Sequence, residues 1–487
     1  PYGRISAPLA NLGENPANLV SILQASMASL PDWQLSKYST SKELVDFYLH
    51  MYPHDTACKI VPVSTPATLQ EAASQILSIT EEIVTLAKSV LSTEQALFLR
   101  TNHTRVTALL ERFPYGAGIP QSELPVVESY IGILEQAKIE PLLCASALWD
   151  TFLGESWQEN IKQLMANNDN ANNKIIFQTS TPYGQIIFTG LEKNNILSGN
   201  ILFIADLGGD DIYALRTQDA WSGIPQMIID FEGNDIYESQ ESGGYASGIG
   251  SVSFLLDHQG NDTYHALKQT QGFGLLGVGI LHDLQGDDEY NAWSMAQGVS
   301  LFGLGLLFDQ AGTDRYQAAG LAQGVGMSGA LGILADLSGD DVYLSTGLGP
   351  TDYGTPGLSD SWSQGIGIGL RVLSPGGVGV LQDESGSDTY TAGSLAQGGG
   401  YYYGLGLLKD NGKQDDTYLG SRYNFGWGAH VGAGYFMESG GDDHYRTRQI
   451  VSAGLAWDLA MVLFEDQDGN DLYEAGDFSL AASALHS

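Results

Sequence analysis

A glycine turn followed by Asp-x-Tyr recurs ten times along this 487-residue chain. The ten tyrosines of the repeat are Tyr213, Tyr237, Tyr264, Tyr290, Tyr316, Tyr343, Tyr390, Tyr418, Tyr445 and Tyr473. Successive copies lie 24 to 28 residues apart, except for one interval of 47 residues that holds an insertion. A repeat this regular constrains the fold more than any other feature of the chain.

A fixed period of about 20 to 50 residues predicts a solenoid, a propeller or a linear array. The repeat lacks helical periodicity and is too short for the four strands of a propeller blade, but it contains short alternating runs between glycine turns. We therefore expect a mainly β fold, a parallel β-helix of about ten coils stacked about 4.8 Å apart.

Alternation along the expected strands predicts which side chains face inward. The positions on either side of each tyrosine vary in type, so the tyrosines should point inside. A second strand precedes each turn and reads Gly-x-Gly-x-Leu-x-Asp, as in residues 277–283. Its glycines and Leu281 should face inward and leave space for the tyrosine rings. The other face, with Val278 and Ile280, forms an apolar stripe that needs a cover.

A column of amides also recurs, at Gln271, Gln297, Gln323, Gln364 and Gln397. Stacked amides can hydrogen-bond to one another along a β stack, so a structural ladder is expected. A ligand-binding row of glutamines is the alternative.

The acidic turn is the candidate metal site, because it repeats two carboxylates in every coil. The first column is Asp206, Asp230, Asp257, Asp283, Asp309, Asp336, Asp383, Asp410 and Asp466, with Glu438 in the same position. The second column is Asp211, Asp235, Asp262, Asp288, Asp314, Asp341, Asp388, Asp416, Asp443 and Asp471. Like charges this close repel by about 0.9 kcal/mol in water and about 3.5 kcal/mol at an effective dielectric of 20. That repulsion has to be relieved.

Two mechanisms of relief remain open. The carboxylates can accept backbone N–H groups in Asx turns, which needs no metal, or hard cations such as Ca²⁺ can sit between coils. Asn234, Thr313 and Ser387 replace the acid that precedes the second column, so that neighbouring position is not an obligatory anion.

The turns resemble the calcium-binding repeats of RTX proteins, whose Gly-Gly-x-Gly-x-Asp units build a β-roll. The copies at residues 260–262 and 469–471 come closest, and the resemblance implies calcium as the bound ion. It covers the turns only, because RTX repeats are much shorter. From about residue 180 to 478 the chain also resembles uncharacterised bacterial repeat proteins rich in glycine and aspartate. That resemblance implies a secreted or envelope location and transfers no catalytic residue.

The first 170 residues differ in pattern and predict an α-helical domain. Helical spacing covers residues 19–30, 41–52, 68–91, 93–113, 123–138 and 141–165. Residues 171–182 read as a linker or cap, residues 183–478 as the solenoid, and residues 479–487 as a C-terminal tail. The helical domain could cap the first coil or lie along the apolar stripe, and the sequence leaves both open.

Charge and composition restrict location and partners. A net charge of −36 argues against nucleic acid as a partner, and the absence of a long apolar run argues against membrane insertion. The acidity, the shortage of lysine and the glycine-rich repeats favour a secreted, periplasmic or surface-exposed bacterial protein, and a first residue other than Met fits a processed mature terminus. Cys58 and Cys144 are the only cysteines, and whether they pair stays open.

The insertion, residues 345–377, is the one asymmetric feature of the repeat. Its candidate recognition residues are Asp352, Tyr353, Asp360, Trp362 and Arg371. Loops that break a regular scaffold often carry binding or catalysis. The run of tyrosines at 401–403 and the region of Trp427 could add an aromatic platform for sugar, or simply pack in the core.

No nucleophile motif, nucleotide loop or zinc spacing is present, and His258 and His282 read as surface residues. The sequence thus favours a non-enzymatic, extracytoplasmic structural protein that forms a homo-oligomer or filament and is stabilised by Ca²⁺, or else has no cofactor. The alternative is a glycan-binding or polysaccharide-cleaving β-helix that uses the insertion, with a glycan or cell-surface partner.

Overall fold

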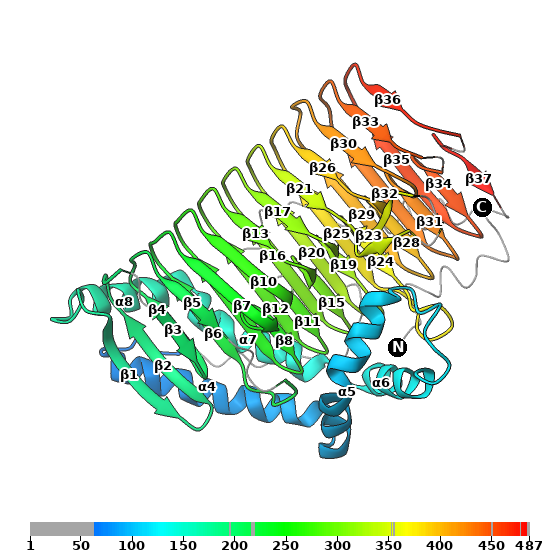
Figure 1. Cartoon of the computed structure of the whole chain (residues 1–487). Helices are drawn as coiled ribbons and strands as arrows, with labels where there is room; N and C mark the ends of the chain where they lie inside the picture. The colour runs from blue at the N-terminus through cyan, green and yellow to red at the C-terminus, as the bar shows by residue number, and fades with distance from the viewer. Residues whose placement is uncertain are drawn as a thin grey trace.

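The computed structural model describes residues 63–193, 196–215, 220–351, 353, 356–449, 451–477 and 479–484. These residues form a helical region followed by a parallel β-solenoid of about ten turns, which confirms the predicted fold class. The coils stack in chain order along the solenoid, from green to red in Figure 1.

The helical region contains five described helices, and its boundaries follow local signals. They are α4 (Leu69–Val90), α5 (Thr93–Arg112), α6 (Leu124–Gln136), α7 (Glu140–Leu153) and α8 (Glu155–Ala166). Thr68 caps α4 by accepting the backbone N–H of Glu71, and Ser92 with Gln95 forms a capping box at α5. The single helix predicted for 141–165 is instead two helices, broken at Gly154. The helices predicted for 19–30 and 41–52 lie outside the described residues.

Sheet A contains the strand that precedes each acidic turn. After β1 (Ile175–Thr181), its parallel strands are β2 (Gly184–Thr189), β4 (Ile201–Asp206), β6 (Gln226–Asp230), β9 (Val252–Asp257), β12 (Val278–Asp283), β16 (Leu304–Asp309), β20 (Leu331–Asp336), β25 (Val378–Asp383), β29 (Leu405–Asp410), β32 (Ala433–Glu438) and β35 (Met461–Asp466).

Sheet B contains the tyrosine strand of each coil. Its main path is β3 (Ile196–Gly199), β5 (Ile212–Leu215), β7 (Ile236–Ser242), β10 (Thr263–Thr270), β13 (Glu289–Asn291), β17 (Arg315–Ala318), β21 (Val342–Ser345), β26 (Thr389–Thr391), β30 (Thr417–Gly420), β33 (His444–Thr447) and β36 (Leu472–Glu474). The short strands β14 (Ser294–Ala296) and β18 (Gly320–Ala322) branch from β10.

Sheet C is a third sheet that the sequence did not predict. It consists of β8 (Ser247–Ile249), β11 (Phe273–Leu275), β15 (Val299–Leu301), β19 (Val325–Gly326), β24 (Ile366–Ile368), β28 (Gly399–Tyr401), β31 (Trp427–Ala429), β34 (Leu455–Trp457) and β37 (Ser483–Ala484). A small fourth sheet joins β22 (Gly349–Pro350), β23 (Ser359–Ser363) and β27 (Ser394–Ala396). The predicted C-terminal tail therefore contributes a strand, β37.

Equivalent residues of successive coils pair in register, so the repeat becomes columns of like side chains. Tyr264 pairs with Tyr237 on one side and Tyr290 on the other. The rings of Tyr264 and Tyr290 stack with centroids 4.7 Å apart and planes within 2°. The column is buried together with Leu281 and its equivalents, which confirms that the tyrosines point inward.

The predicted role of the glycine columns was wrong. A Cβ on Gly279 would lie 2.1 Å from the carbonyl oxygen of Phe273, and one on Gly274 would lie 2.2 Å from that of Leu304. These glycines therefore let the backbones of sheets A and C touch, and the tyrosines pack on the leucine column instead. The sequence predicted only two strands in each coil, so it offered no third sheet for the glycines to face.

The apolar stripe of sheet A is covered, as the sequence required. Val278 and Ile280 are buried in one hydrophobic cluster with core residues of the helices. The α7 helix contacts β9 and β12, and Phe203 of β4 packs against Phe152 and Trp157. Figure 1 shows α7 running beneath the first coils. The helical region thus lies along the stripe, one of the two arrangements left open.

The start of the solenoid is closed separately. Residues 171–182, predicted as a linker or cap, include β1, which pairs antiparallel with β2 at the edge of sheet A.

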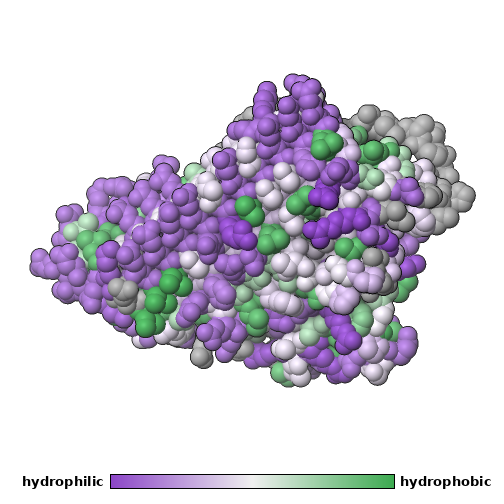
Figure 2. Space-filling view, turned by 45° about the horizontal axis from the view of Figure 1, so that its top comes forward, coloured by the Kyte–Doolittle hydropathy of each residue, from purple (hydrophilic) through white to green (hydrophobic). Residues whose placement is uncertain are grey.

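The face drawn in Figure 2 is mainly hydrophilic, with small scattered apolar groups. Of the helices in the described ranges, none has the length and apolarity needed to span a membrane.

Candidate metal-binding corner of the solenoid

The second column of aspartates links the coils through the backbone. The backbone N–H of Asp235 donates to Oδ1 of Asp262 at 2.6 Å, and that of Asp262 donates to Oδ1 of Asp288 at 2.6 Å. The same bond repeats from Asp211 to Asp471. One oxygen of each carboxylate therefore belongs to a hydrogen-bonded ladder, which is the metal-free turn expected from the sequence.

The first column is bonded in a different way. Oδ1 of Asp283 accepts the backbone N–H of Gln285 at 3.1 Å, and its Oδ2 accepts the hydroxyl of Tyr264 at 2.6 Å. Equivalent tyrosine bonds reach Asp257, Asp309, Asp336, Asp383 and Asp410. Glu438 replaces the aspartate in one coil and accepts from Tyr418. Each coil is thus tied to its neighbour at both acid positions.

The exposed position before the second column forms an outer ladder. Thr313 donates its backbone N–H to Oδ1 of Asp287 at 2.9 Å, and Asn261 donates to Oδ1 of Asn234 at 2.9 Å. The acceptor there can be an amide as well as a carboxylate. This explains why the position is not always acidic.

The second column leaves a row of buried oxygens without a hydrogen-bond partner. Within the described ranges, the partnerless atoms are Oδ2 of Asp235, Asp262, Asp288, Asp314, Asp341, Asp388 and Asp416. All seven residues are at least 98% buried. A buried carboxylate oxygen with no donor is costly, so each of these atoms calls for a proton, a cation or a donor such as water.

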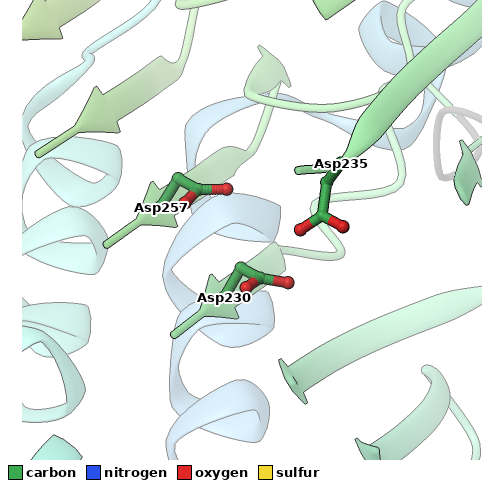
Figure 3. A group of neighbouring side chains, drawn as sticks. All are labelled: Asp230, Asp235 and Asp257. Carbon is green, nitrogen blue, oxygen red and sulfur yellow. The ribbon is translucent and has the colours of Figure 1, made fainter. Parts of the chain in front are cut away.

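Aspartates of the second column are grouped with two carboxylates of the first column. Asp230, Asp235 and Asp257 each offer an oxygen within 4.8 Å of the others, and Figure 3 shows the carboxylates of Asp230 and Asp257 directed to the side on which Asp235 lies. The same grouping recurs at Asp257/Asp262/Asp283, Asp283/Asp288/Asp309, Asp309/Asp314/Asp336 and Asp336/Asp341/Asp383, with three further groups among the described residues. Buried acid triads that can hold a metal ion therefore repeat along the corner.

The electrostatics of the triads disfavour bare charge. Burial, followed by the charges of Asp257 and Asp288, raises the pKa of Asp262 to about 10. Burial, followed by neighbouring carboxylates, also raises the pKa of Asp283 well above its ordinary value. The donor set is carboxylate oxygen only, which suits hard cations such as Ca²⁺ and Mg²⁺ rather than zinc.

The turn glycines make this corner possible. A Cβ on Gly312 would lie 1.6 Å from the carbonyl oxygen of Gly286 and 2.7 Å from Oδ1 of Asp314. Gly260, Gly286 and Gly469 are equally tight against the glycine of the preceding coil. Only glycine allows the coils to stack this closely beside the acids.

The remaining predicted acids lie toward the ends of the columns. Asp206 and Asp443 are buried, and burial raises the pKa of each to about 7. Asp466 and Asp471, in the last coil, are only half-buried. The corner is therefore most enclosed in the middle of the solenoid.

The glutamine column was expected to form a ladder of amides bonded to one another, and this was wrong. The Nε2 of Gln297 donates to the carbonyl oxygens of Tyr290 and Gln317 in successive coils, and Gln271, Gln323, Gln364 and Gln397 do the same with their own strands. The amides clamp sheet B from inside because their left-handed backbone conformation turns them toward it, with φ of 61° at Gln297.

The predicted insertion is two loops rather than one. Gln323 bonds to a carbonyl seven residues back, and Gln364 to one 21 residues back, so one loop falls between Tyr343 and Gln364. Strands β23 and β24 then resume regular coil positions, and a second loop follows before β25. The two loops approach the same surface.

Three of the five predicted recognition residues meet at one pocket. Tyr353, Trp362 and Arg371 line a pocket of about 250 Å³ together with Tyr401 and Trp427. Asp360 lies in β23 outside this lining, and Asp352 falls outside the described residues. The sequence missed Tyr115, which also lines the pocket, because nothing near it in the chain signals contact with a loop more than 200 residues away.

The two histidines flanking the ladder are half-buried on the outer face of sheet A rather than exposed. His258 bonds to Gln158 of α8, and burial lowers its pKa to about 4. His282 packs on Phe308, and burial lowers its pKa to about 3. Both therefore belong to the packing of the stripe.

Cys144 is disulfide-bonded, while Cys58, the other cysteine of the chain, lies outside the described residues.

Comparisons with family models, with curated proteins and with solved structures each found no match to this chain.

Proposed function

We propose that this chain is a non-enzymatic, extracytoplasmic structural protein whose β-solenoid is locked by a row of calcium ions along its acidic corner. The observation that carries the proposal is the row of seven buried Asp Oδ2 atoms without hydrogen-bond partners. Five of these aspartates, Asp235, Asp262, Asp288, Asp314 and Asp341, are grouped with carboxylates of two successive coils, so an ion bound there joins one coil to the next.

The spacing of the triads allows one calcium ion to contact all three carboxylates. Calcium binds oxygens at about 2.3 to 2.6 Å, so two of its ligands can be no more than about 4.6 to 5.2 Å apart. The triad oxygens lie within 4.8 Å of one another. The carboxylates of the first column keep their tyrosine bonds, and those of the second column keep their backbone bonds, so the ligands are fixed before an ion arrives.

An extracytoplasmic location has two supports. Disulfide bonding of Cys144 suits an oxidising compartment. Extracellular calcium modules also work with weak sites, of about 10⁻⁴ to 10⁻³ M, because calcium is abundant there. Bound calcium would reduce the charge repulsion in a chain of net charge −36, because every ion offsets two negative charges.

The direct test is a count of bound metal. The full chain is dialysed to equilibrium against millimolar calcium, and the excess of calcium on the protein side over the buffer side is measured by elemental analysis. We expect several calcium ions per chain and their removal by a chelator. A chain that retains its fold and binds no divalent cation at millimolar concentration contradicts the cation row.

Assembly into a homo-oligomer or filament is a further part of the proposal. The apolar stripe is buried through β25 and is unsuited to this role. The last coil instead exposes Leu463, Leu472 and Tyr473. Analytical ultracentrifugation over a range of concentrations tests it, and a strictly monomeric chain contradicts it.

A second candidate function, glycan binding, is favoured by the pocket of Tyr353, Trp362 and Arg371. Aromatic rings and an arginine suit a sugar ring with polar substituents. The described residues that line this pocket include no aspartate or glutamate, while Asp352, beside Tyr353 in the chain, lies outside the described residues. Since glycoside cleavage generally uses a pair of carboxylic acids, the lining supports binding rather than cleavage.

A further inference from the structure

The pocket of about 250 Å³ lies where three separate parts of the chain converge. Tyr115 comes from the segment between α5 and α6, Tyr353 and Arg371 come from the two inserted loops, and Trp457 comes from β34 of sheet C. The backbone N–H of Arg371 donates to the carbonyl oxygen of Tyr115 at 2.8 Å. The helical region and the loops therefore hold each other in place around the pocket.

The aromatic walls are held rigid by one another. Trp362 stacks on Tyr115 with ring centroids 5.5 Å apart and meets Tyr401 edge-on at 5.4 Å. Trp427 donates its indole N–H to the carbonyl oxygen of Ala396 at 3.0 Å. A wall that does not reorganise loses little entropy when a ligand binds.

Two arginines lie at or beside this pocket in a chain that has few basic residues. The whole sequence has 21 Lys and Arg against 57 Asp and Glu. Yet Arg371 lies exposed in the lining, and Arg422 sits 4.4 Å from the ring centre of Tyr353 with its Nε buried and without a hydrogen-bond partner. Two acids lie close by: Asp458 is bonded to His430, which also lines the pocket, and the charge of Asp360 acts on Tyr353 from outside the lining. Within the lining itself, Arg371 is the group that can hold an anion.

A second pocket, of about 260 Å³, is formed by the same two segments of the chain as part of the first. It is lined by Val372, Pro375, Tyr402 and neighbours, which directly follow Arg371 and Tyr401 in the chain. Each pocket is smaller than the roughly 300 to 1,000 Å³ that hold drug-sized ligands. The pair suits an extended molecule, and Arg371, which lines the first pocket, directly precedes Val372, which lines the second.

From this geometry we infer that the two pockets bind an acidic oligosaccharide, with a uronate-type carboxylate held by Arg371. The inference rests on the glycan-binding role proposed above and names its ligand class. Arginine pairs with a carboxylate through two parallel N–H bonds, which fixes the position of the sugar ring. Aromatic faces then contact the apolar side of the ring, as they do in many ligand pockets.

The test measures binding of short oligogalacturonides and of their neutral methyl esters to the full chain by calorimetry, at fixed calcium. We expect binding of the acid form, with Arg371→Gln weakening it at least about tenfold, the loss expected for a charge-assisted hydrogen bond. Arg315→Gln, on the outer face of β17, is the matched control and should leave the affinity unchanged.

The outcomes separate the two levels of the proposal. Esters that bind as well as acids overturn the acidic ligand and leave the binding role standing. Acid binding that survives Arg371→Gln also overturns the inference, and it points to calcium bridging on the acidic surface. If neither form binds, the binding role itself fails. Unchanged melting of Arg371→Gln establishes that any loss is not a loss of fold.

Discussion

The hydroxyl of Tyr264 donates to Oδ2 of Asp283, 2.6 Å away and at the start of the next coil. This bond joins the tyrosine column of the core to the acid column of the corner, and it repeats along the solenoid. The core and the corner are therefore coupled, and a substitution that weakens one of them should also destabilise the other.

Tyr264→Phe tests that coupling. It leaves the ring stack in place but removes the donor from a fully buried carboxylate, so we expect the free energy of unfolding to fall by about 1 to 3 kcal/mol. The measurement is urea unfolding at equilibrium. Tyr473→Phe is the control, because Tyr473 is 36% exposed and its acid partner can bond to water. Equal losses in the two variants would show that the buried bond has no special weight.

Asp287 and Asp288 are neighbours in the chain, but Asp288 belongs to a triad and Asp287 to the outer ladder. Substitutions at the two positions therefore test the two structures separately. Asp288→Asn keeps the Oδ1 acceptor for the backbone of Asp262 but removes a calcium ligand, so it should reduce the rise in melting temperature that calcium produces. In chelator the same variant should melt higher than the parent, because its amide N–H₂ can donate to Asp283 or Asp309.

Asp287→Asn is the matched control, with the same change of charge one residue away. Asp287 is exposed and its Oδ1 serves only the outer ladder, where an asparagine already occurs at the equivalent position. Its melting curves should follow the parent both with calcium and in chelator. If the two variants behave alike, net charge rather than the triad governs stability.

Gly312→Ala tests the close stacking of the turns. Its Cβ would lie 1.6 Å from the carbonyl oxygen of Gly286, a backbone atom that cannot move without shifting a whole coil. We expect a loss of several kcal/mol, or failure to fold, from a clash of this size. Gly132→Ala in α6, where nothing lies within 4 Å, should instead be neutral or stabilising by about 0.5 to 1 kcal/mol. Circular dichroism and thermal melting distinguish the two.

The contact of α5 with the solenoid should depend on pH through His103. Burial lowers the pKa of His103 below 6.5, and its ring bonds to Tyr130 and to Gln269 at 3.1 Å each. A histidine whose folded pKa lies below its unfolded value costs stability once the pH falls below that unfolded value, about 6.5. Lys268, paired with Glu111, opposes protonation further.

Parent and His103→Gln are therefore compared by urea unfolding above and below about pH 6.5. The parent should lose stability relative to the variant on acidification, by no more than about 1.4 kcal/mol per pH unit. The difference between the two chains isolates the histidine from the many carboxyls that also titrate. A constant difference across this range would contradict the neutral histidine.

The tyrosine and aspartate columns were predictable because alternation along a strand and a fixed period leave few choices. Sheet C was not, since strands as short as β19, Val325–Gly326, carry no detectable alternation of their own. The glycines of that region are explained only by the contact between two backbones, as at Gly279 and Phe273.

The candidate site was likewise only partly predictable from the sequence. The acids of the corner were all identifiable from the repeat, whereas their division of labour depends on hydrogen bonds between coils. Asp283 accepts one hydrogen bond at each oxygen, from Tyr264 and from a backbone N–H, while Asp288 keeps one oxygen without a partner. The pocket needed Tyr115 and Arg371 to meet across the fold, which only the packing of the helical region on the solenoid reveals.

The central claim, that cations complete the acidic corner, is tested most directly by the melting temperature of the full chain with calcium and with excess chelator at the same pH and ionic strength. Binding to the folded state alone adds about 2.7 kcal/mol per site at a hundredfold excess over Kd. We predict a large, saturable rise in the melting temperature with calcium and its complete reversal by chelator. Superimposable melting curves in calcium and in chelator would contradict the account and leave the acids to protons and backbone hydrogen bonds alone.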